Sequence, residues 1–322
     1  MFCNIMDLRF YLKVTDKNYD KVVSFMESKY ISPFTDFGFK KLFGEEGNKN
    51  LLVSFLNDLL PIKNKIVDIS FKENQQLGDD FLSRSAVYDI FCEDEKNNQF
   101  IVEMQNARQT YFRDRAVFYS TFPIREQAKK GLWNFKLKEV YCVGLLGFNL
   151  DDTPTEDEEV IWEYIHTVNL KDPNNKLFYN KLTYLFIELP RFDKKETEIK
   201  THFEKWMYFL KNLDNFDNIP AILQEEVFEE AFKVAEIANY TPDQRREYES
   251  SLKSYRDNIN VIETAIEEGR VAGEKEGREK GREERAVEIA RNLLFAGTNI
   301  ETIATVTGLT KQDIEKLRQE QH

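Results

Sequence analysis

Two short segments joined by a polar loop constrain the fold of this chain more than any other feature. The segments, Ala86–Cys92 and Phe100–Gln105, predict two adjacent β-strands. The intervening residues 93–99, of sequence EDEKNNQ, are polar and rich in turn formers. The two strands are therefore expected to form an antiparallel hairpin, which brings polar side chains of both strands close together.

Three of these side chains form a candidate site: Asp89 on the first strand, and Glu103 and Gln105 on the second. Side chains alternate along a strand, so Glu103 and Gln105 share one face, with Ile101 on the same side. Residues directly opposite each other in an antiparallel pair point the same way. If the register sets Asp89 opposite Glu103, two carboxylates lie within reach of one divalent ion, with an amide beside them.

The length of the turn decides this register. A three-residue turn in which Asp94 pairs with Asn98 sets Asp89 opposite Glu103. A two-residue turn would move Asp89 to the other face of the hairpin. Asn97 suits the left-handed backbone position that the longer turn requires. The alternative interpretation is that the two acids are ordinary polar residues on a solvated sheet face.

Further along, several sequence blocks occur in an order that is more specific than any single block. They are Ser32–Phe43, Val87–Asp89, Ile101–Gln105, Tyr111–Arg115, Tyr119–Arg125 and Val140–Gly144. In this order the chain resembles the recombination-promoting nuclease and transposase family of the PD-(D/E)xK nuclease superfamily, over roughly residues 30–190. The resemblance implies Mg²⁺-dependent DNA endonuclease activity on a restriction-endonuclease-like fold. Tyr88 replaces the proline of the motif, and Gln105 replaces its lysine.

The chemistry of the residues agrees with this resemblance. Phosphodiester hydrolysis requires neutralised charge on the phosphate and an activated water, and a carboxylate-bound Mg²⁺ supplies both. Asp89 and Glu103 are predicted metal ligands, the Met104 carbonyl is a third oxygen, and Mn²⁺ is expected to substitute for Mg²⁺. Gln105 can orient a water or phosphate oxygen, but it can neither carry positive charge nor act as a base.

A helix is expected from Asp36 to about Phe43. The resemblance suggests that this helix contributes an additional acidic residue, Asp36, to the catalytic site. The alternative is that Asp36 is an N-cap, which satisfies unpaired amides of the first turn.

The stretch from Arg108 to Lys138 is the most cationic part of a chain whose net charge is −12. Arg108, Arg113 and Arg115 directly follow the candidate metal strand and are predicted to bind DNA phosphates. Tyr111, Phe112 and Tyr119 are interleaved with them on an expected helix. The alternative is an amphipathic helix whose aromatic residues pack on the sheet and whose arginines face water.

The pattern as a whole predicts an α/β fold: a restriction-endonuclease-like mixed sheet flanked by helices, followed by an α-helical C-terminal region. Four segments are expected, namely an N-terminal extension (1–30), a nuclease-like domain (31–192), a helical region (193–262) and a charged helical tail (263–322). The helical region could cover the sheet or form a separate bundle. No run of about 20 apolar residues and no signal-peptide pattern is found, so a cytoplasmic protein without a membrane anchor is expected. The cysteines are dispersed, and no His/Cys cluster suggests zinc.

The tail contains glycines at every fourth position from Gly269 to Gly281, within a Glu/Lys/Arg-rich run. Such a stripe could allow close approach of another helix, or the run could be a solvated helical linker. Residues 300–314 then predict two short helices joined at Thr307-Gly308, as in a helix-turn-helix. Their near-neutral charge suits homo-oligomerisation or packing at least as well as DNA reading.

Two functions therefore remain open from the sequence. The first is a metal-dependent DNA endonuclease, acting in recombination or mobile-element biology as the family name implies. The second is a catalytically inactive DNA-binding or assembly protein built on a nuclease fold.

Overall fold

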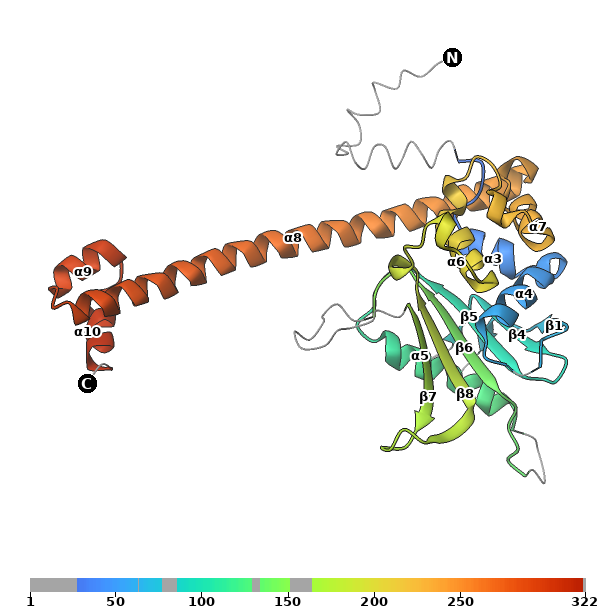
Figure 1. Cartoon of the computed structure of the whole chain (residues 1–322), viewed down its shortest axis with the longest axis horizontal. Coiled ribbons are helices and arrows are strands. Elements are labelled where there is room, and N and C mark those ends of the chain that lie inside the picture. The colour runs from blue at the N-terminus through green and yellow to red at the C-terminus, as the bar shows by residue number, and fades with distance from the viewer. Residues whose placement is uncertain (1–27, 63, 77–85, 129–133, 151–163, 321–322) are drawn as a thin grey trace, which may run out of the picture. The chain divides into compact units, whose positions relative to one another are not determined.

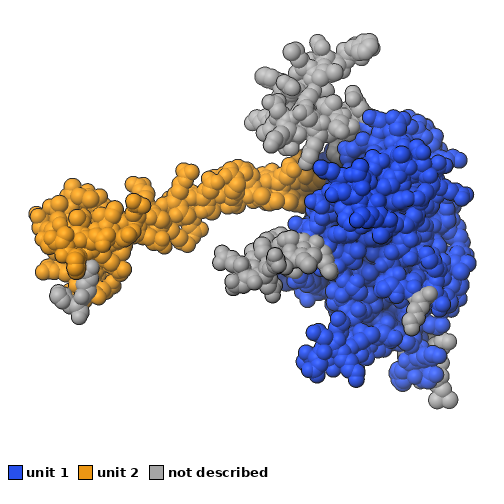
Figure 2. Space-filling view, in the orientation of Figure 1, with its two compact units in different colours: residues 1–256 blue, residues 257–322 orange. Residues whose placement is uncertain are grey.

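The computed structural model describes residues 28–62, 64–76, 86–128, 134–150 and 164–320. The chain divides into two compact units, residues 1–256 and 257–322, shown in different colours in Figure 2. The division falls within helix α8, Pro242–Phe295 (Figure 1). Most of the predicted N-terminal extension lies outside the described residues.

The first unit is built on a six-stranded mixed sheet with the strand order β1-β4-β5-β6-β8-β7 (Figure 1). Its central strands β5, β6 and β8 are parallel, and the outer pairs are antiparallel. The strands are β1 (Ile69–Phe71), β4 (Ile90–Asp94), β5 (Gln99–Gln105), β6 (Val140–Leu146), β7 (Ile165–Lys171) and β8 (Leu177–Glu188). The predicted mixed sheet is confirmed, and a short pair, β2 (Gln75–Gln76) and β3 (Ala86–Val87), lies outside it.

Strand β6 explains why the middle of the sheet is parallel. Every residue of Val140–Leu146 is buried, as expected for a strand covered on both faces. A parallel pair needs a crossover connection, and helix α5, Phe112–Glu126, lies in the connection from β5 to β6. The basic segment after the candidate metal strand therefore forms the crossover.

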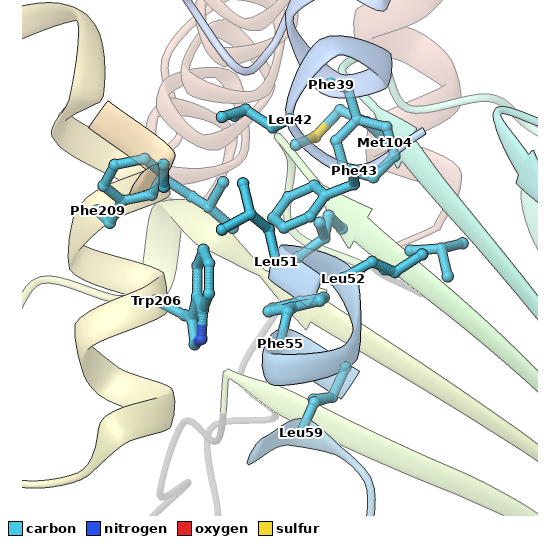
Figure 3. Close-up of a cluster of buried hydrophobic side chains, with 14 of the residues drawn as sticks. Phe39, Leu42, Phe43, Leu51, Leu52, Phe55, Leu59, Met104, Trp206 and Phe209 are labelled. Carbon is cyan, nitrogen blue, oxygen red and sulfur yellow. The ribbon is translucent and has the colours of Figure 1, made fainter. Parts of the chain in front are cut away.

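One face of the sheet carries the main hydrophobic core. Alternate residues of β5, Phe100, Val102 and Met104, belong to this core together with buried side chains of α3, α4, α6 and α7. Figure 3 shows Met104 with side chains of α3, α4 and α6. These helices are α3 (Asp36–Phe43), α4 (Lys49–Leu59), α6 (His202–Asn212) and α7 (Glu226–Ala235). Residues of the predicted helical region 193–262, such as Trp206 and Phe228, thus cover the sheet.

The opposite face of the sheet packs against α5 in a second, smaller core. Ile101 of β5 and Cys142 of β6 contribute to this core, together with Phe112 and Phe122 of α5. Of the three interleaved aromatic residues, Phe112 is buried in this core and Tyr119 packs against it, as the alternative interpretation predicted, whereas Tyr111, just before the helix, is 73% exposed. By alternation, Glu103 follows Ile101 on the face that α5 covers.

The second unit consists of the remainder of α8 with α9, Ile300–Thr307, and α10, Lys311–Gln319. The two short helices are joined through Gly308, which has a left-handed φ of 75° that a glycine adopts without strain. Thr310 caps α10 by accepting a hydrogen bond from the Asp313 amide. Buried Ala290, Ile303, Ile314 and Leu317 form a small core, and the predicted helix-turn-helix is confirmed.

Candidate active site

The hairpin has the register that the sequence predicted. Ile90 pairs with Val102, and the Asp94 amide donates a hydrogen bond to the Asn98 carbonyl at 3.0 Å. Asn97 has a φ of 63°, the left-handed conformation expected in a three-residue turn. Continuing this register by one residue places Asp89 opposite Glu103.

The chain bends at Asp89, immediately before β4 begins. An oxygen of the Asp89 carboxylate accepts a hydrogen bond from the Met104 amide at 2.8 Å. This bond holds the Asp89 side chain at the end of β5. The carboxylate takes the place of a backbone carbonyl as the acceptor for the Met104 amide. Asp89 is therefore held by β5, the strand that carries Glu103.

Asn74 holds this bend, and the sequence patterns did not reveal its role. Its side-chain amide donates to the Asp89 carbonyl at 3.0 Å, and its side-chain oxygen accepts from the Phe91 amide at 3.2 Å. Its own carbonyl accepts from the Tyr88 amide at 2.9 Å. Three hydrogen bonds from one residue thus fix the backbone on both sides of Asp89. Asparagine is common in turns, so residue type alone could not have distinguished this position.

Glu103 is an acid in an environment that penalises its charge. Its side chain is 13% exposed and lies beside the α5 core. Burial, reinforced by the negative charge of Asp89, raises the pKa of Glu103 to about 8, while the charge of Arg115 opposes this shift. Burial also raises the pKa of Asp89, against the Met104 hydrogen bond and the charge of Lys40. Two like charges therefore meet in one poorly solvated place.

Arg115 faces inward, toward Glu103. Its guanidinium lies 4.0 Å from the Glu103 carboxylate, and it also donates to the Gln109 side chain at 2.7 Å. Both Arg115 and Glu103 line a small crevice of about 20 Å³ beneath α5. The structure thus places Arg115 at the carboxylates themselves, whereas Arg108 and Arg113 lie at the exposed surface.

Gln105 and Met104 complete the arrangement. The Gln105 side-chain amide lies 3.4 Å from the Glu103 carboxylate, at the end of the same strand face. The Gln105 carbonyl accepts a hydrogen bond from Gly147, just beyond β6. Since backbone groups alternate between the two neighbours of a strand, those of Met104 lie on the β4 side, where Asp89 is.

Asp36 occupies the first turn of α3, but it is not the N-cap. Thr35 caps the helix by accepting a hydrogen bond from the Gly38 amide, so the interpretation of Asp36 as the cap is wrong. Asp36 instead forms an ion pair with Lys40 at 2.7 Å. Its negative charge contributes to the raised pKa of Asp89. A catalytic role for Asp36 remains a prediction.

The donor set suits a hard, hydrated cation. Among the described residues, no cluster of three or more His, Cys, Asp or Glu side chains could hold a metal ion. Asp89, Glu103 and the Met104 carbonyl would supply only oxygen ligands, and Mg²⁺ is commonly bound by one or two carboxylates together with waters and substrate phosphate. The adjacent like charges of the two acids also favour a bound cation.

A mixed sheet with flanking helices and a pair of hairpin acids at its end defines the class of restriction-endonuclease-like proteins. Residues 33–265 match the family model described as PD-(D/E)XK nuclease family transposase, and the chain belongs to this family. The sequence-based resemblance is thereby confirmed over the whole sheet and its helices. The family supports a function related to nucleases and transposases.

The C-terminal helices match a second family model. Residues 283–319 are similar to the C-terminal HTH domain of the Rpn/YhgA-like nuclease family, which agrees with the observed α9-turn-α10 arrangement. Searches of curated proteins and of solved structures found no match. Within the described part of the chain, no helix has the length and apolar character required to span a bilayer.

Proposed function

We propose that this protein is a metal-dependent DNA endonuclease that hydrolyses phosphodiester bonds, with Mg²⁺ as its cofactor and Mn²⁺ as a substitute. The observation that carries the proposal is the meeting of Asp89 and Glu103 across the hairpin, in the register that the three-residue turn imposes. Family membership supports it independently. Recombination or mobile-element biology is the proposed setting.

Each residue has a distinct task in this proposal. A bound Mg²⁺ would neutralise phosphate charge and lower the pKa of a water. Asp89, Glu103 and the Met104 carbonyl would hold it, and Gln105 would orient the attacking water or a phosphate oxygen by hydrogen bonding. The water oxygen bonds to phosphorus, the bond from phosphorus to the leaving sugar oxygen breaks, and the proton lost by water is balanced by one gained at that oxygen.

In this proposal, Arg115 supports the catalytic site through its effect on Glu103. Its charge opposes the rise in the pKa of Glu103 and so favours the ionised carboxylate that a cation requires. Arg108 and Arg113 are exposed and remain the proposed contacts to the DNA backbone. Phosphate contacts of this kind position the duplex without reading its sequence.

The decisive experiment is cleavage of supercoiled plasmid with Mg²⁺, with Mn²⁺ and with EDTA. Asp89→Asn and Glu103→Gln should each reduce the rate by at least about 10³-fold, and EDTA should abolish cleavage. The matched control is Glu93→Gln, which removes a carboxylate of the same hairpin that pairs with Lys72 at 2.7 Å. This variant should retain activity.

Calorimetric titration of Mg²⁺ provides a readout that does not depend on turnover. Wild type and Glu93→Gln should bind the ion, whereas Asp89→Asn should not. If purified wild type cleaves no DNA with any divalent ion, the catalytically inactive DNA-binding protein becomes the better description.

A further inference from the structure

A large cavity of the first unit lies apart from the candidate active site. Its volume is about 690 Å³, within the range of about 300–1,000 Å³ that is typical of small-molecule pockets. Phe100 of β5 lines it, whereas Glu103 lies on the opposite face of the same strand. Phe100 is also near the start of β5, and Gln105 is its last residue. The cavity and the candidate active site are therefore on different faces and at different ends of the sheet.

One wall of this cavity is a row of four residues from four neighbouring strands. Phe100 of β5 pairs with Tyr141 of β6, and Tyr141 pairs with Thr183 of β8. Thr183 in turn pairs with Asn169 of β7. Residues that pair across neighbouring strands point to the same face of a sheet. All four line the cavity, so the row presents two aromatic rings, a small side chain and an amide.

The two rings form a stack that a third ring can extend. The ring centroids of Phe100 and Tyr141 are 5.3 Å apart, and their planes are inclined by only 7°. Neighbouring strands are about 4.8 Å apart, so residues of one row repeat at nearly the spacing of this stack. At the next position of the row, Thr183 has a small side chain, which leaves room for a planar ring beside Tyr141. The row therefore favours a ligand that stacks.

Polar groups follow the stack along the same row. The Asn169 side-chain amide donates a hydrogen bond to the Thr183 hydroxyl oxygen at 2.9 Å, which holds this amide against β8. Asn180, an exposed residue of β8, also lines the cavity. A side-chain amide offers both donors and an acceptor, and asparagine recognises the edge of a base in this way. These groups suit a ring with donors and acceptors on its edge better than a hydrocarbon ring.

The charged side chains that line the cavity are Asp94, Glu139, Lys96 and Lys138. The Asp94 carboxylate accepts hydrogen bonds from groups of its own turn, and Glu139 accepts one from the Tyr141 hydroxyl. Lys96 pairs with the adjacent glutamate at 3.0 Å. Lys138 is exposed and donates to the Lys96 carbonyl at 2.7 Å, and a lysine ammonium has three donors. The two acids are thus engaged within the protein, and Lys138 has donors to offer to an anion.

We propose that this cavity binds a nucleobase together with its phosphate. The ring would stack beside Tyr141, its edge would contact Asn169 and Asn180, and the phosphate would lie at Lys138. A free mononucleotide and an unpaired nucleotide of a DNA strand share this chemistry, and the experiments below distinguish these two sources. The inference goes beyond the proposed hydrolysis and does not depend on it.

Calorimetric titration of the four deoxynucleoside monophosphates into the full-length protein tests the stack. The titrations are made in EDTA, so the result is independent of cleavage. Tyr141→Leu removes the ring and should weaken binding roughly tenfold or more, the loss typical of one stacking contact. Tyr141→Phe keeps the ring and should bind as wild type does, although it loses the hydrogen bond to Glu139.

An exposed residue provides a test that leaves the core intact. Asn180→Ala should weaken binding about three- to tenfold, the loss typical of one or two hydrogen bonds. The matched control is Asn174→Ala, an exposed asparagine in the turn of the same hairpin that does not line the cavity. The control should bind as wild type does, and both variants should keep the wild-type melting temperature. Equal affinities of these two variants would overturn the inference.

Lys138→Met tests the phosphate contact. This variant should lower the affinity for a mononucleotide and leave that for the corresponding nucleoside unchanged. Lys136→Met is the control, because Lys136 is exposed and does not line the cavity, and it should change neither affinity. Equal losses of nucleotide and nucleoside affinity in Lys138→Met would reject Lys138 as the phosphate contact.

A single-stranded oligonucleotide distinguishes the two sources of the base. Weaker oligonucleotide binding by Asn180→Ala, but not by Asn174→Ala, would assign the cavity to an unpaired base of a DNA strand. Weaker binding of mononucleotides alone would assign it to a free nucleotide. The inference fails if no mononucleotide binds wild type at millimolar concentration and Tyr141→Leu and Asn180→Ala bind the oligonucleotide as wild type does. A protein that cleaves no DNA would refute the nuclease proposal and leave these binding results unaffected.

Discussion

The candidate site in the first unit and the C-terminal helices of the second unit differ in how charges are arranged. In the first unit, Asp89 and Glu103 are held together in a buried place, and burial raises the pKa of both. In the second unit, the cations of the α9–α10 region lie beside acids: Lys311 is 2.7 Å from Glu301, and Arg291 is 3.3 Å from Glu320. The candidate site brings like charges together, whereas the C-terminal helices pair opposite ones.

This difference indicates which region of the protein is expected to bind a ligand. Gathering like charges in a poorly solvated place costs folding free energy, and such clusters mark functional sites more often than random positions do. Neutralised surface pairs contribute little to stability or to phosphate attraction. The helix-turn-helix fold of the second unit therefore does not by itself make that unit the main DNA-binding surface.

The largest effect on the second unit should come from its core. Ile303→Ala removes a fully buried side chain from a core with only four buried members among the described residues. The expected cost is roughly 2–5 kcal/mol, enough to unfold so small a unit. Hydrogen exchange should show loss of amide protection in α9 and α10, while plasmid cleavage persists.

The control for this change is Val306→Ala on the same helix, because Val306 is 62% exposed. That variant should retain protection. Loss of cleavage upon unfolding of the second unit would show that the two units are not functionally separable.

Removing one of the two like charges should stabilise the first unit at alkaline pH. The folded pKa of Glu103 is raised to about 8, above its ordinary value of 4.5, so the folded state keeps a proton that the unfolded state releases. Stability is therefore lost as pH rises from about 4.5 to about 8. In EDTA, Glu103→Gln should raise the free energy of unfolding at pH 8 by roughly 4 kcal/mol and change it little at pH 5.

With Mg²⁺ at pH 8, wild type should become more stable than Glu103→Gln, since a ligand that binds only the folded state stabilises it. Thermal denaturation of wild type and Glu103→Gln, with and without the ion, measures both effects. A Glu103→Gln variant that is less stable than wild type at pH 8 in EDTA would contradict the proposed electrostatic conflict.

Those features of the site that depend on local rules could be predicted from the sequence. The three-residue turn follows from the chemistry of residues 95–97, including the left-handed Asn97, and the strand alternation then fixes the register. The turn at Gly308 in the second unit is likewise local. Predicted helix bounds for α3 agree with the structure for the same reason.

Features that depend on tertiary packing could not be predicted in this way. The distance of 4.0 Å between the Arg115 guanidinium and the Glu103 carboxylate depends on how α5 packs on the sheet, and the predicted contact of Arg115 to DNA stays a prediction. Thr35, which precedes the expected start of α3, caps the helix in place of Asp36. The role of Asn74 depends on residues that are distant in sequence, and its residue type alone does not signal such a role.

The smallest expected effect compares the cations of the two units directly. Arg108→Ala/Arg113→Ala removes two charges that directly follow the candidate metal strand, whereas Lys311→Ala/Lys316→Ala removes two charges of α10 that form ion pairs with Glu301 and Asp313. The first pair should weaken DNA binding roughly tenfold and flatten the salt slope by about 2. The second pair should change affinity by less than about twofold, because its charges are already neutralised. Fluorescence anisotropy over a salt series measures both, and a larger loss from the second pair would assign DNA binding to the helix-turn-helix unit.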